Sequence, residues 1–179
     1  MPTSYRIVQI DEQSWRRLRD VRLAALQADP SGFGSTLERE LDFGEDRWRN
    51  WPRTSACFLV TPTTADPVTT SASAAEPPEP GPAVGLAVGK DSQDGTEAEL
   101  NALWVAPEYR GSGLGAELVK AVMESARASG KRRLTLWVTT GNSAAIEVYE
   151  RLGFLRTGAA KPLPSDPQLT EVEYARPLG

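Results

Sequence analysis

A glycine-rich segment in the second half of the chain has the residue types of a phosphate-binding loop. Residues 102–119 read ALWVAPEYRGSGLGAELV, so a strand-like run is followed by Gly111, Gly113 and Gly115 and then by a helix-like pattern. Because glycine has no Cβ, a ligand can approach its backbone, and a helix start offers unpaired N–H groups and the positive end of a dipole. Arg110 adds a guanidinium that can bind phosphate oxygens.

The surrounding residues discriminate among phosphate ligands. The string G-x-x-x-x-G-K-S/T of a P-loop does not occur in the chain. Gly111, Gly113 and Ala116 satisfy the G-x-G-x-x-A pattern of dinucleotide-binding folds, but the next predicted strand ends in TTGN, without the carboxylate that such folds place there. The interpretation as a nicotinamide-dependent oxidoreductase is therefore supported by one short match alone. A turn without a ligand explains one glycine better than three beside an arginine.

The same loop resembles that of the GCN5-related N-acetyltransferase (GNAT) family. Arg110, Gly113 and Gly115 fit the family signature Q/R-x-x-G-x-G/A, and they follow a strand that ends in WVAP. A later segment, GNSAAIEVYERLGF, is similar to the second cofactor motif of the family, with Asn142, Ala145 and Tyr149 in the usual places. The resemblance covers about residues 83–160.

The resemblance implies acetyl-coenzyme A as the cosubstrate and no metal. Its pyrophosphate is expected on the backbone of the glycine loop, which comprises Arg110, Gly111, Ser112, Gly113, Leu114, Gly115 and Ala116. The pantetheine arm is expected to lie like an extra strand along the backbone of Leu103 and Val105. Asn142, Ala145 and Tyr149 complete the expected cofactor site, and Asn142 could equally be a plain helix N-cap.

The chemistry implied is transfer of an acetyl group to a primary amine by direct attack. Such an amine is mostly protonated at pH 7, so a base is expected, and Glu99 is the first candidate, with Glu97 or water as alternatives. Tyr149 is the expected acid toward the coenzyme A sulfur, although it could be a core aromatic instead. Cys57 lies in an apolar strand without any histidine in the chain, so it is read as a buried hydrophobe.

The acceptor amine is not specified by the sequence. The segment ERELDFGEDRW carries five acidic side chains that could favour a cationic amine, but arginines balance them, so a solvated helix face is the simpler interpretation. A small-molecule amine is slightly favoured over a peptide or protein. The alternative function is an acyl-coenzyme A sensor or a catalytically inactive binding module of the same family.

The elements that would position these residues alternate in a mixed α/β pattern. Strands are expected at 5–10, 56–61, 83–89, 98–105, 134–139, 154–157 and 169–175, and helices at about 15–29, 37–51, 116–129 and 142–152. We expect Pro52 to end the second helix. In the family this order gives a mostly antiparallel sheet flanked by helices, with parallel strands that splay at the acetyl-coenzyme A site.

Residues 62–82 are rich in Thr, Ser, Ala, Glu, Gly and Pro, a composition that predicts a disordered insertion. Because a strand is expected on either side, we interpret it as a long connection within one domain that spans 1–179, and a domain boundary is the competing interpretation.

Composition limits the partners and the compartment. The chain has 179 residues, 20 Lys and Arg against 24 Asp and Glu, and a net charge of −4, which gives no general attraction to nucleic acid or anionic membranes. The start has no signal-peptide pattern, and no apolar run is long enough to span a bilayer. A cytoplasmic location is expected, and the sequence leaves a homodimer open.

Overall fold

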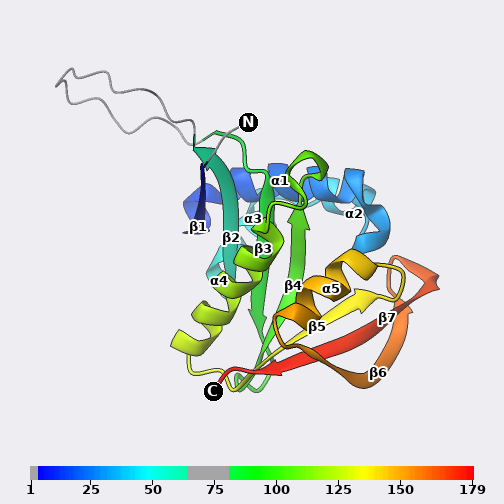
Figure 1. Ribbon diagram of the computed structural model, residues 1–179. Helices are drawn as coiled ribbons and strands as arrows, with labels where there is room; N and C mark the ends of the chain where they lie inside the picture. Colours follow the sequence, from blue (N-terminus) through cyan, green and yellow to red (C-terminus); the bar gives the residue numbers. More distant parts are fainter. Residues whose placement is uncertain (1–3, 64–80) are drawn as a thin grey trace, which may run out of the picture.

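The computed structural model describes residues 4–63 and 81–179 (Figure 1), and its central feature is one seven-stranded sheet. The strand order is β1-β2-β3-β4-β5-β7-β6, and every neighbouring pair is antiparallel except β4 and β5, which are parallel. This mixed sheet agrees with the expected fold class. The strands are β1 (Ser4–Ile10), β2 (Ser55–Thr63), β3 (Gly85–Asp91), β4 (Ala98–Val105), β5 (Arg133–Thr139), β6 (Leu155–Leu163) and β7 (Asp166–Pro177).

Helices cover both faces of the sheet. α1 (Trp15–Ala28), α2 (Leu37–Leu41) and α3 (Glu45–Thr54) pack on one face, and α4 (Leu114–Ala128) and α5 (Ser143–Arg151) lie on the other (Figure 1). α1 buries the apolar positions at helical spacing that the sequence indicates, Leu18, Val21 and Ala25 among them. α4 buries Leu118 and Val122 against β2, β3 and β4 in the same way.

The predicted helix over 37–51 is wrong in two respects. The segment forms two helices, because the helix is interrupted at residues 42–44. Gly44 takes an extended conformation there as the N-cap of α3. Pro52 does not end α3, which continues to Thr54. A proline there removes one backbone hydrogen bond close to the end of the helix, where the loss is smallest.

The C-terminal hairpin is longer than the sequence suggests. The predicted strands over 154–157 and 169–175 are parts of β6 and β7, which pair with each other from Leu155↔Ala175 to Leu163↔Asp166. β6 is an edge strand with nearly all its residues exposed, so it lacks the apolar alternation by which a strand is recognised in sequence.

A β-bulge on β4 marks the point at which the pairing of β4 with β5 ends. Val88 and Gly89 are adjacent on β3, but their partners are Ala102 and Leu100, so Asn101 is an extra residue on β4. The pairing of β4 with β5 runs only from Ala98↔Leu134 to Leu100↔Leu136 and stops at the same point. Beyond the bulge the two parallel strands diverge, as the family resemblance implies.

β2 and β3 are antiparallel neighbours, from Ser55↔Lys90 to Val60↔Gly85. The segment predicted as an insertion therefore joins two adjacent strands. Its predicted start at residue 62 is wrong, because Pro62 and Thr63 belong to β2 and pair with β1. Residues 64–80 lie outside those described, so the disorder prediction is not tested there. Within 4–63 and 81–179, no helix is long and apolar enough to cross a membrane.

Candidate active site

The glycine loop joins β4 to α4 through a backbone that only glycine adopts easily. Gly111 and Gly113 have φ angles of +76° and +86°, in the left-handed region, and Gly113 is the N-cap of α4. Gly115 has an ordinary helical backbone, so its conformation does not require glycine. A Cβ built on any of the three would meet no atom within 4 Å, which shows that the loop is open on its outer side.

Backbone N–H groups are concentrated at this loop. The first backbone bond at the start of α4 runs from the Glu117 N–H to the Gly113 carbonyl, at 3.1 Å, and no side chain caps the helix. Within the described parts of the chain, no acceptor is recorded for the N–H groups of residues 111–116. Free donors at a helix N-terminus suit a diphosphate, so these residues fit the phosphate portion of coenzyme A.

The divergence of β4 from β5 leaves backbone groups of β4 without a strand partner. The Ala106 N–H donates to the Val84 carbonyl at 2.8 Å, so the backbone of Ala106 faces away from β5 and toward the β3 side. Because backbone groups alternate along a strand, those of Val105 and Leu103 point to the opposite side, into the gap beside β5. The gap therefore offers the strand edge on which an extended pantetheine arm could add.

Arg110 is held by the protein itself. Its Nε donates to the Val105 carbonyl at 2.9 Å, and its Nη2 pairs with Asp29 Oδ2. The same carboxylate oxygen accepts a hydrogen bond from Trp104 Nε1 at 2.7 Å. Asp29, which directly follows α1, thus joins the end of that helix to β4 and the glycine loop. These contacts fasten the loop to β4 and to the end of α1, and the predicted contact of the Arg110 guanidinium with phosphate stays a prediction.

Tyr149 lies on α5 beside the core. Its ring is 5% exposed and packs at a tilt against Phe154, with the ring centroids 5.9 Å apart. Burial raises the pKa of the Tyr149 hydroxyl well above its ordinary value, so the group keeps its proton at physiological pH. No hydrogen-bond partner is recorded for this hydroxyl among residues 4–63 and 81–179.

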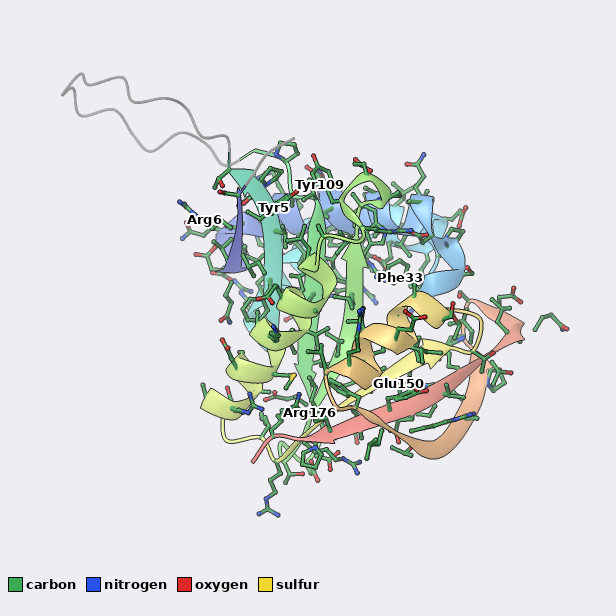
Figure 2. The ribbon with its side chains drawn as sticks, in the orientation of Figure 1. Tyr5, Arg6, Phe33, Tyr109, Glu150 and Arg176 are labelled. Carbon is green, nitrogen blue, oxygen red and sulfur yellow. The ribbon has the colours of Figure 1, made fainter. Side chains whose placement is uncertain are left out.

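α5 is fixed at both ends. The Asn142 side chain caps the helix by accepting from the Ala145 N–H at 3.2 Å. β7 fastens the other end, because the Tyr174 hydroxyl donates to Glu150 at 3.2 Å and Arg176 donates to the Leu152 carbonyl. Figure 2 labels Glu150 and Arg176 in this region. Tyr149 is therefore presented by a rigid helix, which suits a residue that must act at a defined position.

A cavity of about 390 Å³ lies between the helices α1–α3 and the sheet. Glu99 from β4 lines it, with its carboxylate accepting from Asn101 Nδ2 at 3.2 Å. Glu171 from β7 lines it as well, and desolvation raises the pKa of this buried carboxyl, with the nearby Glu99 charge adding to the effect and Lys161 opposing it. The cavity thus holds two carboxylates from strands that are far apart in sequence.

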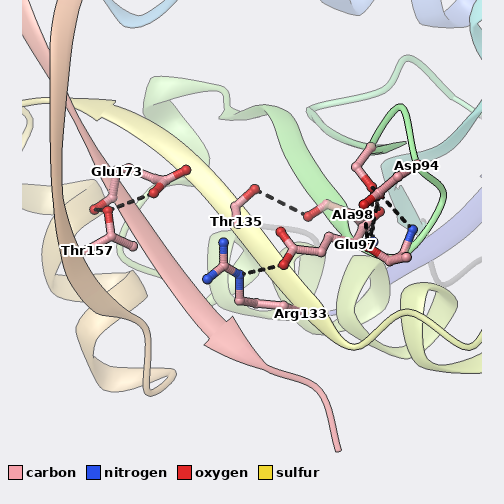
Figure 3. Close-up of polar contacts among 9 residues, drawn as sticks. Asp94, Glu97, Ala98, Arg133, Thr135, Thr157 and Glu173 are labelled. Atoms are coloured by element: carbon pink, nitrogen blue, oxygen red, sulfur yellow. Dashed lines mark hydrogen bonds and ion pairs between the residues drawn. The ribbon is translucent and has the colours of Figure 1, made fainter.

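Glu171 was missed by the sequence analysis. It stands in TEVEY, where Glu171 and Glu173 alternate with apolar residues as on any half-exposed strand. Only the pairing of β7 with β5, which sets Glu171 opposite Thr139, brings it to the cavity. No local signal separates it from Glu173, which instead accepts a hydrogen bond from Thr157 at 2.7 Å (Figure 3).

Glu97 does not line this cavity. Its carboxylate pairs with Arg133 Nε at 3.1 Å, close to the turn in which Asp94 is held by hydrogen bonds (Figure 3). Hydrogen bonds from Thr96 and Ser92 lower the pKa of Asp94 to about 2. Glu97 therefore belongs to a polar turn, and Glu99 remains the better placed of the two candidate bases.

Cys57 is fully buried in β2, and desolvation raises the pKa of its thiol to about 12. A thiol with this pKa carries almost no thiolate at neutral pH, and the thiolate is the nucleophilic form. The interpretation of Cys57 as a core residue fits this environment.

The acidic segment is not the uniform solvated face that the sequence suggested. Glu40 is only 2% exposed and receives two hydrogen bonds from Arg22, at 2.8 and 3.0 Å, while Arg22 itself is 5% exposed. Glu45 is bonded to Arg49 at 2.7 Å on the outer side of α3. A buried bidentate ion pair therefore fixes α2 against α1, and it neutralises the charge of Glu40.

The chain matches the model of one known protein family. The model of the acetyltransferase (GNAT) family matches residues 35–154, more than half of the chain. The chain belongs to this family. Both cofactor motifs lie in the matched GNAT region, and so do α2, α3, β2–β5 and α5.

Curated relatives share shorter segments with this GNAT chain. An uncharacterised N-acetyltransferase of Methanocaldococcus jannaschii is 44% identical over 57 residues, which is 32% of this chain and 25% of that protein. The mycothiol acetyltransferase of Corynebacterium glutamicum is 41% identical over 56 residues, 31% of this chain and 19% of that protein. The matches thus span a quarter or less of these relatives.

A solved structure extends the likeness over the whole fold. YncA from Salmonella typhimurium, described as a putative acetyltransferase with its cofactor acetyl-CoA, is 18% identical and superimposes with a TM-score of 0.70, covering 99% of this chain and 95% of that one. At this identity the likeness concerns the GNAT fold alone.

Proposed function

We propose that this protein is an N-acetyltransferase of a single domain that transfers the acetyl group of acetyl-coenzyme A to a primary amine, with a small-molecule amine favoured. The observation that carries the proposal is the set of unbonded N–H groups at residues 111–116, beside the diverging strands β4 and β5. Because the chain belongs to the acetyltransferase (GNAT) family, we interpret this geometry as a site for acetyl-coenzyme A.

The residues that would hold acetyl-coenzyme A are mainly backbone groups. The N–H groups of the glycine loop suit the diphosphate, and Leu103 and Val105 suit the pantetheine amides. Bound there, acetyl-coenzyme A supplies an acetyl group activated as a thioester. The protein need only place an uncharged amine near it and manage protons.

Glu99 and Glu171 are proposed to hold the acceptor amine and take its proton. Glu99 is the candidate base, because Asn101 orients its carboxylate in the cavity. Tyr149 is proposed as the acid, since its buried hydroxyl keeps its proton. With Cys57 buried as a thiol, the amine would react directly, without a covalent enzyme intermediate.

A binding measurement with matched glycine variants tests this function. We expect acetyl-coenzyme A at about 1 mM to raise the melting temperature of the protein, and NAD to leave it unchanged. Gly115→Val should abolish that rise without backbone strain, because Gly115 has a negative φ and its surroundings are open. Gly130→Ala is the control: it introduces backbone strain at a left-handed position outside the loop, and it should leave the rise with acetyl-coenzyme A intact.

The second part of the experiment follows thiol release from acetyl-coenzyme A in the presence of primary amines. Turnover supports the transferase. A thermal shift without release of thiol from any amine would support a sensor or an inactive binding module instead, and the absence of any shift would refute the proposal.

A further inference from the structure

The face that α2 and α3 turn toward the cavity is cationic. Arg39, Phe43, Arg47 and Trp51 follow one another at intervals of four residues, and all four line the cavity. The one acidic side chain of this segment that also lines it, Glu40, is neutralised by Arg22. The net charge that this wall presents is therefore positive, although the segment as a whole is acidic.

The guanidiniums on this wall outnumber their carboxylate partners. Arg39 and Arg47 form no ion pair within residues 4–63 and 81–179, and the Arg47 guanidinium lies over the Phe43 ring at 3.8 Å from its centroid. Arg22 also lines the cavity, and its Nη1 is buried without a hydrogen-bond partner in the described part of the chain. Of these three guanidiniums, only that of Arg22 therefore has a carboxylate partner, Glu40.

The opposite wall, formed by the sheet, carries the negative charge. Glu99 has no cationic partner among the described residues, and Glu171 is only partly compensated by Lys161, whose Nζ is 3.9 Å from its carboxylate. The Lys161 Nζ also lies over the Trp137 ring, 3.9 Å from its centroid. The lining of the cavity also includes the rings of Phe33, Trp51 and Trp137.

From this polarity we propose that the acceptor is a small amine that also carries a carboxylate. Its amine would face Glu99 and Glu171, its carboxylate would face Arg39 and Arg47, and its carbon skeleton would lie between the aromatic rings. A simple cationic amine would satisfy only the acidic wall and leave the guanidiniums without a partner. This proposal rests on the proposed transferase function and specifies the substrate class of the same site.

The test compares amines that differ only in the carboxylate. The full-length protein is assayed for thiol release with leucine and isoamylamine, with lysine and cadaverine, and with 4-aminobutyrate and propylamine. We expect kcat/KM to be about ten- to a hundredfold higher for the carboxylate-bearing member of at least one pair, the usual scale for hydrogen bonds to charged groups.

Arginine variants then locate the effect. Arg39→Gln and Arg47→Gln should each reduce that preference and the double variant should abolish it, because kcat/KM should fall much further for the carboxylate-bearing amine than for its carboxylate-free counterpart. Arg6→Gln on β1 is the matched control, since Arg6 is exposed and lies on the far side of the molecule from Phe33 (Figure 2). It should change neither rate.

Two results would overturn the inference while leaving the transferase intact. One is equal or faster turnover of the carboxylate-free member in every pair, and the other is an equal loss of both activities in the arginine variants. A protein that neither binds acetyl-coenzyme A nor releases thiol with any of the six amines would refute the proposed function, and the inference with it.

Discussion

The side of this protein that is proposed to bind the cofactor, called the cofactor side, and the side that is proposed to bind the amine, called the acceptor side, are built in different ways. The cofactor side consists of β4, the glycine loop and α5, which lie between residues 98 and 151, and it offers mainly backbone N–H and carbonyl groups. The acceptor side is a cavity whose charged side chains come from α1, α2, α3, β4, β6 and β7. Backbone groups are common to every sequence, so the first site can be shared across a family while the second varies.

Asp29 connects these two regions. It ends the α1 segment on the acceptor side, and its carboxylate binds Trp104 on β4 and Arg110 at the glycine loop. Gly32 and Phe33, only a few residues further on, line the acceptor cavity. A single carboxylate therefore connects the segment before Gly32 and Phe33 to β4 and the glycine loop.

The largest effect is expected at Tyr149, where the cofactor side depends on a side chain. Tyr149→Phe keeps the ring that packs against Phe154 and removes only the hydroxyl. We expect kcat to fall by roughly 10²- to 10⁴-fold, the scale for a lost general acid, while acetyl-coenzyme A affinity and melting temperature stay the same. Steady-state kinetics and thermal shift separate the two. An equal loss of affinity or stability would make Tyr149 a packing residue.

An intermediate effect is expected when the link between the regions is cut. Asp29→Ala leaves Trp104 Nε1 and the Arg110 guanidinium without their acceptor, which costs roughly 1–3 kcal/mol. We expect KM to rise about tenfold for both acetyl-coenzyme A and the amine, with a melting temperature lower by several degrees. Asp20→Ala, which removes only a pair with the adjacent Arg19, is the control. A change in stability alone would show that the two sites are independent.

The smallest effect concerns the charge of Glu171. Its pKa is raised in the folded protein, chiefly by desolvation, so folding favours its protonated form and stability falls as pH rises through that pKa. Glu171→Gln should raise the melting temperature by a few degrees at most at pH 7–8 and by nothing near pH 4, where the carboxyl of the parent is largely protonated.

Thermal denaturation across this pH range measures the difference. Glu99→Gln should also raise the melting temperature, but by less. The reason is that the Glu99 charge contributes less than desolvation to the raised pKa of Glu171. A Glu171→Gln variant that is less stable than the parent at pH 7 would show that the carboxylate is stabilised by its surroundings instead.

The sequence by itself determined the features that depend on neighbouring residues. Strands β1, β2 and β4, helices α1 and α4, and the glycine loop before α4 were all predicted, because side-chain patterns and the backbone freedom of glycine act over a few residues. Membership of the GNAT family follows from two such local motifs.

Only the tertiary structure decided which charges meet. The break between α2 and α3, the bulge at Asn101, the attachment of Arg110 to Asp29, the burial of Glu40 against Arg22 and the arrival of Glu171 opposite Thr139 all join residues from separate elements. Strand register and desolvation set these contacts, and neither depends on the residues next to them in the chain. The loop that suits the cofactor could therefore be predicted from the sequence. The arrangement of charged side chains around the proposed acceptor cavity could not, because it is set only on folding.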